Sequence, residues 1–169
     1  LDHVRKPARY TGGEYNAVCK DKTEVDLRFA FCFPDLYEIG MSHLGSKILY
    51  GLMNGMEGVW CERAYAPYVD MEEEMRRRGQ PLYALESGDP ISEFDILGFT
   101  LQYEMNYTGV LNMLDLVGIP KRSADRRELR PLVMAGGPCA YNAEPMADFF
   151  DLIVVGEGEE VMPELLQLY

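Results

Sequence analysis

Residues 25–33 read VDLRFAFCF, a run that begins with alternating apolar residues and then becomes continuously apolar. Such a run is typical of an inner strand in a sheet that is covered on both faces. We expect four more strands, because similar runs follow along the chain: GVWCERAY at 58–65, FDILGFTL at 94–101, PLVMAGG at 131–137 and FFDLIVVG at 149–156.

Segments with the spacing of amphipathic helices separate these predicted strands. Leu44, Ile48 and Leu52 recur every fourth residue behind Ser42, a residue type that favours N-caps, so 43–54 is predicted to be a helix that buries this stripe. The loop PDLYEIGM lies between the first strand and this helix. Two later helices are predicted from further apolar stripes: Val110, Leu114 and Val117 in one, and Val161, Leu165 and Leu168 in the other.

The clearest predicted helix is PYVDMEEEMRRRG, which starts near Pro67 and ends before Gly79. Its acids lie early and its arginines late, as the helix dipole favours. Three ion pairs are predicted at a spacing of four: Glu72 with Arg76, Glu73 with Arg77, and Glu74 with Arg78.

Strands that alternate with helices indicate an α/β fold with a parallel sheet covered on both faces. We predict a doubly wound, flavodoxin-like domain over residues 25–169, with five parallel strands in the order 2-1-3-4-5. Residues 1–24 are polar and rich in turn formers, and Gly12-Gly13 lies between two segments rich in strand formers. This pattern predicts a short N-terminal hairpin.

Composition excludes several classes of function. The chain has 169 residues and a net charge of −12, which disfavours nucleic-acid binding because phosphates require clustered Lys and Arg. No apolar run approaches the roughly 18 residues that a membrane helix needs, so we expect a soluble, cytoplasmic protein that binds neither membrane nor nucleic acid. The start without Met and the end inside a predicted helix suggest a fragment of a longer protein.

Metal and nucleophile motifs are absent from the sequence. The four cysteines, Cys19, Cys32, Cys61 and Cys139, lack metal-ligand spacing and are expected to be free thiols in a reducing compartment. With two histidines, the chain shows no Ser-His-Asp or Cys-His arrangement. We therefore predict no metal site built from protein side chains alone and no catalytic residue.

Ligands of such sheets bind at the carboxyl ends of the strands, near the point where the strand order reverses. The loops at that edge read DLYEIG at 35–40, TLQYE at 100–104, GGPCAYN at 136–142 and GEGE at 156–159. Tyrosines occur in or near these loops and are expected either to line a ligand face or to pack in the ordinary way: Tyr37, Tyr103, Tyr107 and Tyr141.

These four loops resemble the cobalamin-binding, Rossmann-like domain found in front of many radical SAM enzymes. In cobalamin-binding proteins the first loop reads Asp-x-His-x-x-Gly, and its His is the lower cobalt ligand. Here Asp35 and Gly40 stand at the matching positions, but Tyr37 replaces the His. A phenol is a poor ligand for corrin cobalt, so three alternatives stay open: cobalamin without a protein ligand, ligation by another residue such as His43, or no cobalamin.

The remaining loops extend the resemblance. Thr100-Leu101-Gln102 corresponds to the Ser-x-Leu that lies near the cofactor's tail: Thr100 keeps the hydroxyl, but Gln102 replaces the Leu. GEGE is a recurrent feature of such domains next to radical SAM modules. The resemblance implies that cobalamin contacts are made by the following residues: Asp35, Tyr37, Gly40, His43, Thr100, Gln102, Gly136, Gly137, Gly156, Glu157 and Gly158. Gly136 and Gly137 also have an ordinary structural explanation, since strand-to-helix turns need close backbone approach.

The combination of PDLYEIGMSHLG, ERAYAP, GFTLQYE, AGGPCAYNAEP and GEGEE resembles the N-terminal region of a family of fused radical SAM proteins. This resemblance implies a C-terminal radical SAM domain that holds a 4Fe–4S cluster and S-adenosylmethionine. Its CxxxCxxC motif is absent here, so no turnover is expected of this domain alone. The implied function is corrinoid binding and docking on the radical SAM barrel. A degenerate scaffold without cofactor is the alternative, and a nucleotide or flavin binder is disfavoured by the acidic loops.

Overall fold

In the computed structural model, which describes residues 4–169, five parallel strands form one sheet in the order β2-β1-β3-β4-β5. The order and the parallel direction confirm the prediction from the sequence, and the fold is α/β of the flavodoxin-like type. The strands are β1 (Leu27–Phe33), β2 (Val59–Tyr65), β3 (Ile96–Thr100), β4 (Leu132–Gly136) and β5 (Leu152–Ile153).

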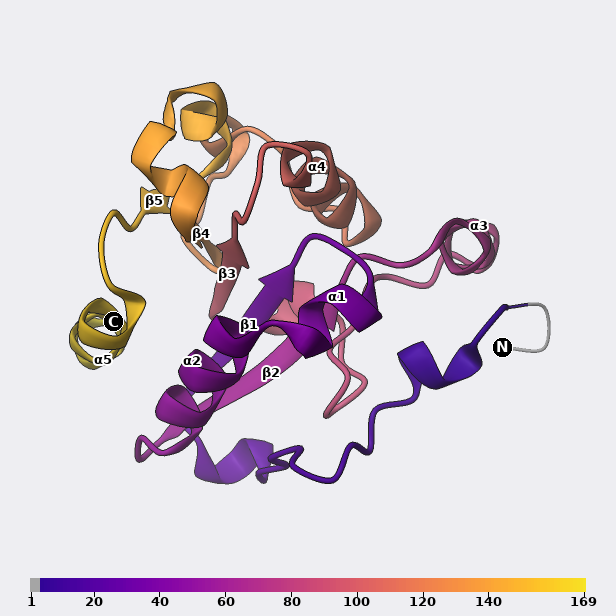
Figure 1. Ribbon diagram of the computed structural model, residues 1–169, viewed down its shortest axis with the longest axis horizontal. Coiled ribbons are helices and arrows are strands. Elements are labelled where there is room, and N and C mark those ends of the chain that lie inside the picture. Colours follow the sequence, from indigo (N-terminus) through magenta and orange to yellow (C-terminus); the bar gives the residue numbers. More distant parts are fainter. Residues whose placement is uncertain (1–3) are drawn as a thin grey trace.

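Helices cover both faces of the sheet (Figure 1). On one face, α2 (Leu44–Asn54) and α5 (Gly158–Leu168) lie side by side over Phe29, Phe31 and Met134. On the other face lie α3 (Val69–Arg78) and α4 (Asn106–Leu116), and the short helix α1 (Tyr37–Ser42) precedes α2. Side chains alternate along each strand, so each strand supplies both apolar cores.

The helix α2 is rotated relative to the predicted orientation. It buries Ser46, Tyr50 and Met53, whereas Leu44 is 68% exposed and Ile48 is 44% exposed. The Tyr50 hydroxyl accepts a 2.7 Å hydrogen bond from the Val18 amide, so the polar end of this buried ring is satisfied. The prediction that Leu44 and Ile48 face the core is therefore wrong, and an apolar stripe is left on the surface.

The start of α2 also differs from the prediction. Its N-cap is His43, whose Nδ1 accepts a 3.1 Å hydrogen bond from the Ser46 amide. Ser42 instead ends α1, a helix in the segment predicted to be a loop, and its hydroxyl donates to the carbonyl of Glu38.

Two other helices partly follow the prediction. In α3, Arg78 and Glu74 pair as expected, but Arg77 pairs with Glu74 at 2.7 Å rather than with Glu73. In α5 the buried residues are Met162 and Leu166, one position beyond the predicted stripe, and Leu168 is exposed.

The predicted N-terminal hairpin is wrong. Residues 4–24 contain two 3-10 turns, Pro7–Tyr10 and Lys22–Glu24, and no strand. Polar groups of this segment also bond to the rest of the fold: Trp60 Nε1 donates to the carbonyl of Val18 at 2.9 Å. Gly12 lets the backbone approach Leu85 closely, since a Cβ at Gly12 would lie 2.2 Å from the carbonyl oxygen of Leu85.

Two further expectations concern the cysteines, as free thiols, and the absence of a membrane-spanning helix from the described residues. All four cysteines are free thiols, and burial raises the pKa of Cys32 and Cys61, which keeps these two thiols protonated. Within residues 4–169, no helix is long and apolar enough to cross a bilayer.

Candidate functional site

A groove of about 430 Å³ lies between α2 and α5, above the carboxyl-terminal halves of β1, β3 and β4. This volume lies within the range of roughly 300–1,000 Å³ that small-molecule sites occupy. In the sheet, β2 lies on one side of β1, and β3, the next strand of the chain, lies on the other side of β1. The groove therefore lies at the point where the strand order reverses.

The floor of the groove is apolar. Phe29 and Phe31 from β1 and Met134 from β4 point into it, because residues two apart on a strand share a face. Gly98 in the middle of β3 makes room for this floor, since a Cβ there would lie 2.1 Å from Cζ of Phe29. The missing side chain at Gly98 therefore lets the Phe29 ring lie flat across the sheet.

Glycines form much of the wall. Gly136 ends β4, Gly156 lies between β5 and α5, and Gly158 begins α5. Gly137 has φ 96° and ψ −179°, a conformation nearly confined to glycine, and a Cβ there would lie 2.9 Å from the carbonyl oxygen of Leu101. The wall thus exposes backbone rather than side chains to any occupant.

The polar groups of the groove are few. Gln102 Nε2 donates to Thr100 Oγ1 at 2.5 Å, and the exposed ring of Tyr141 stands at the mouth. Glu157 and Glu159 flank the N-terminus of α5, where they oppose a bound phosphate. These features suit a largely apolar, flat ligand better than a free nucleotide or flavin phosphate.

The structure brings together most of the residues that the sequence suggested. Those that line the groove are His43, Thr100, Gln102, Gly136, Gly137, Gly156, Glu157 and Gly158. The sequence reasoning missed the floor residues Phe29, Phe31 and Met134. The alternation of side chains along a strand could have found Met134, because it stands two residues before Gly136 and therefore lies on the same face of the sheet.

Three of the suggested residues lie outside the groove, in or beside α1. Asp35 accepts hydrogen bonds from the Leu36 amide at 2.7 Å and from the Tyr103 hydroxyl. Gly40 packs on aromatic side chains, since a Cβ there would lie 2.2 Å from Cε1 of Tyr65. Asp35 and Gly40 therefore have structural partners of their own.

Tyr37, at the position of the family's His, is also turned away from the groove. Its hydroxyl donates to Glu14 Oε1 at 2.9 Å, and its ring meets that of Tyr65 edge-on at 5.5 Å. Burial and the Glu14 carboxylate raise the pKa of Tyr37, so the phenol stays protonated at neutral pH. Arg63 holds the other oxygen of Glu14 at 3.0 Å, which ties the N-terminal segment to this loop.

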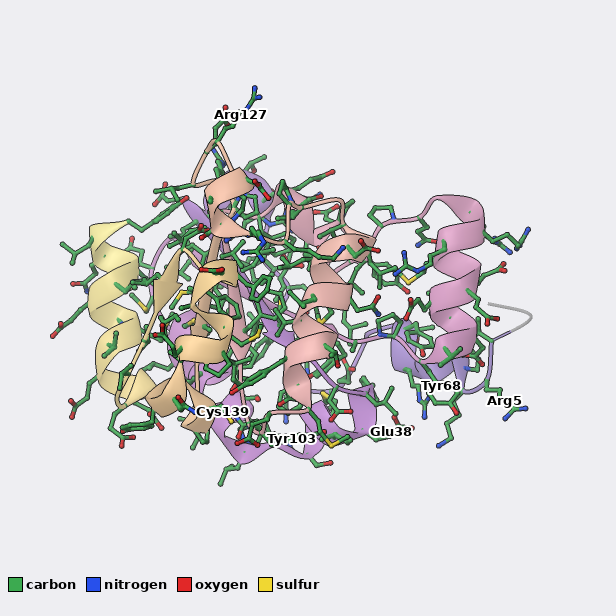
Figure 2. All side chains as sticks on the ribbon, turned by 90° about the horizontal axis from the view of Figure 1, so that it is seen from above. Arg5, Glu38, Tyr68, Tyr103, Arg127 and Cys139 are labelled. Carbon is green, nitrogen blue, oxygen red and sulfur yellow. The ribbon has the colours of Figure 1, made fainter. Side chains whose placement is uncertain are left out.

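Figure 2 shows how the loops gather at one edge of the sheet. Glu38, Tyr103 and Cys139 follow β1, β3 and β4, and they lie along the same side of the molecule, whereas Arg127 projects from the opposite side. In the part of the chain that the structure describes, no three His, Cys, Asp or Glu side chains form a group that could hold a metal ion.

Comparison with known proteins assigns the chain to a family. The family model described as "Radical SAM proteins, N-terminal" matches residues 45–169, well over half of the chain. This chain belongs to that family. The match of the radical SAM N-terminal domain includes the groove's glycine wall but begins after β1 and His43.

One curated relative of this radical SAM N-terminal domain is an uncharacterized protein, MJ0966, of Methanocaldococcus jannaschii. It is 37% identical over 90 residues, which cover 50% of this chain and 18% of that relative. The matched part is thus a small share of a much longer protein. The chain matches no solved structure.

Proposed function

We propose that this radical SAM N-terminal domain binds a corrinoid, with the benzimidazole nucleotide tail in the groove between α2 and α5. The observation that carries the proposal is the glycine-walled, apolar-floored groove at the switch point of the sheet. When bound, a corrinoid supplies a cobalt centre that can carry a methyl group. The protein's own part is to hold the tail and to exclude water from it.

The groove residues suit the base of the tail in two ways, and they limit where its phosphate can lie. Phe29 and Phe31, which are 2% and 6% exposed, form an aromatic floor under a flat heterocycle. Thr100 and Gln102 offer hydroxyl and amide groups for polar atoms of the tail. Glu157 and Glu159 repel its phosphate, which would then lie away from α5.

The proposal extends to the rest of the polypeptide. We propose that residues 25–169 form the corrinoid-binding unit and that a radical SAM domain with a 4Fe–4S cluster and S-adenosylmethionine follows in the same chain. The family assignment supports this arrangement. The chemistry of the whole protein would then take place where the two units meet.

Hydroxocobalamin tests the binding proposal directly. The chain is mixed with the corrinoid at high micromolar concentration and passed over a gel-filtration column while corrin absorbance is followed. We expect corrin to co-elute with the protein. Cobinamide, which lacks the nucleotide tail, is the matched control and is expected to bind at least about tenfold more weakly, since a lost set of tail contacts of about 1.4 kcal/mol gives that ratio. Absence of co-eluting corrin, or equal binding of both corrinoids, would contradict the proposal.

A second candidate function is docking without a cofactor, and the exposed stripe on α2 favours it. Leu44 and Ile48 lie on the solvent side, and Ile39 in α1 is 47% exposed. Apolar side chains that are gathered on one surface often mark a contact with another protein unit. We propose the radical SAM domain as the unit that covers this stripe.

The substitution Ile48→Ser distinguishes a role of this side chain in docking from a role in the stability of the domain alone. In this chain alone the change is expected to alter the free energy of unfolding by about 0.5 kcal/mol or less, because the side chain is on the surface. In the complete polypeptide it is expected to cost roughly 1–2 kcal/mol, since apolar surface would be buried there. Urea unfolding of both proteins measures the difference, and Lys47→Ser is the control. Equal effects of Ile48→Ser in both proteins would refute the docking role of this stripe.

A further inference from the structure

We infer that His43 supplies the nitrogen that ligates the cobalt of a corrinoid held in the groove. The inference rests on the proposed corrinoid binding and names the residue that takes over from the missing His of the first loop. It starts from the position of His43, which lines the groove at the beginning of α2.

One ring nitrogen of His43 is already committed to the protein. Nδ1 lies 3.1 Å from the Ser46 amide nitrogen and 2.8 Å from Ser46 Oγ. Nε2 has no hydrogen bond to any of the residues 4–169 that the structure describes. The ring is fixed by this cap and by Phe33, whose ring centroid is 5.5 Å away. Metal-binding histidines donate a hydrogen bond from their second ring nitrogen, and Ser46 Oγ is the acceptor that lies within reach of Nδ1 here.

Gly45 gives the ring its space. A Cβ at this position would lie 2.9 Å from Cε1 of His43, so any larger residue would push the imidazole out of its present orientation. Gly45 itself lines the groove next to His43. The glycine therefore leaves room for the imidazole in its present orientation.

Ligation requires a defined tautomer. With Nδ1 accepting from the Ser46 amide, the proton of the neutral ring is on Nε2. For Nε2 to bind cobalt, this proton must move to Nδ1, which would then donate a hydrogen bond to Ser46 Oγ at 2.8 Å in place of accepting one from the Ser46 amide. The imidazole would take the place of a water ligand, with no electron transferred. Ser46 thus becomes the partner that orients the ligand, as outer hydrogen bonds do in other metal sites.

Other groups in the groove are poorer candidates. Met134 and Met162 are almost fully buried in the core of this face, with exposures of 3% and 5%. Glu157 and Glu159 offer carboxylate oxygens, which suit hard cations better than corrin cobalt. Tyr37 is bonded to Glu14, outside the groove. Imidazole nitrogen is therefore the best donor that the groove presents.

Electron paramagnetic resonance of bound cob(II)alamin tests the assignment. The unpaired electron of this cobalt state lies along the axis of the lower ligand, so a ligating nitrogen splits the lines. In protein grown with 15N-labelled histidine, ligation by histidine gives doublets, whereas the cofactor's own benzimidazole gives triplets. We expect doublets from the labelled protein and triplets from the unlabelled one.

The variant His43→Asn identifies which histidine is responsible. Asparagine is among the most favoured N-cap residues, so α2 and the fold are expected to persist. Far-ultraviolet circular dichroism measures whether they do. The doublets are expected to disappear in this variant and to return as triplets when unlabelled imidazole is added. Ser46→Ala is expected to weaken the ligation by roughly 10- to 100-fold.

The outcomes distinguish this inference from the proposed function. Bound corrinoid with triplets or unsplit lines in the labelled protein would overturn the role of His43 while leaving corrinoid binding intact. Doublets that survive in His43→Asn would overturn it as well. Failure of cob(II)alamin to bind at all would overturn the proposed function and this inference together.

Discussion

Replacement of Gly136 by leucine is expected to weaken hydroxocobalamin binding by about 5- to 150-fold while the fold persists. Gly136 ends β4 and lines the groove, and a Cβ there would have Val154 as its nearest neighbour at 3.9 Å. A leucine side chain therefore has room to extend, but the room is that of the groove itself. Overfilling a packed site costs roughly 1–3 kcal/mol, which corresponds to a factor of about 5 to 150 in affinity. Gel filtration with corrin absorbance, followed by a titration, measures the change.

Gly51→Leu is the matched control for this prediction. Gly51 lies on the exposed side of α2, and a Cβ there would meet nothing within 4 Å. The same chemical change is thus made in the same domain but outside the groove. Hydroxocobalamin binding by Gly51→Leu is expected to equal that of the unchanged chain. If Gly136→Leu binds as well as Gly51→Leu, the tail does not occupy this groove.

Replacement of Arg126 by alanine is expected to destabilise the domain by about 3–5 kcal/mol. The Arg126 and Asp151 side chains are 4% and 5% exposed, and Nη2 of Arg126 lies 2.9 Å from Asp151 Oδ1. Arg126 also donates to the carbonyls of Pro120 and Phe149 at 2.8 and 2.9 Å. Removing one partner leaves the buried carboxylate of Asp151 without its counter-charge, and that is the costly case for buried ion pairs. Urea unfolding measures the loss.

Arg127→Ala provides the comparison one residue away. Arg127 is exposed and projects from the edge of the sheet opposite the groove (Figure 2). Its replacement is expected to change the free energy of unfolding by about 0.5 kcal/mol or less. A cost below about 1 kcal/mol for Arg126→Ala would mean that the fold tolerates an unpaired Asp151, contrary to the expectation.

The sheet could be predicted because its signals are local. Each strand is a short apolar run, and the alternation with helices leaves few parallel topologies. The rotation of α2 could not be predicted in this way, since Leu44, Ile48 and Leu52 have the ideal spacing of a buried stripe. Tyr50 is buried in their place because its hydroxyl meets the Val18 amide, a partner 32 residues earlier in the chain. Helical spacing contains no information about such a partner.

The hairpin was mispredicted for a related reason. Gly12 and Gly13 both have positive φ, as a turn requires, but Gly12 is needed for its contact with the Leu85 carbonyl. Local sequence shows that a glycine is required without showing which neighbour requires it. The carbonyl of Val18, which would have paired within a hairpin, accepts its hydrogen bond from Trp60 instead.

For the candidate site, loop position was a better guide than motif identity. Residues taken from the loops after β3, β4 and β5 lie in the groove, because parallel strands all end at the same edge. Asp35, Tyr37 and Gly40 stand at the spacing of the first loop of cobalamin-binding proteins, yet they lie outside the groove. The reason is physical: α1 begins at Tyr37 and directs this ring toward Glu14, a residue that no motif of the loop includes.

The family match begins at residue 45, and this boundary falls inside the fold. β1 precedes it, yet β1 is hydrogen-bonded to β2 on one side and to β3 on the other. A polypeptide cut at residue 45 would lack β1, and β2 would have no neighbour in the sheet. The matched region is therefore smaller than the sheet, and experiments on this family should take their boundaries from the hydrogen bonds of the sheet.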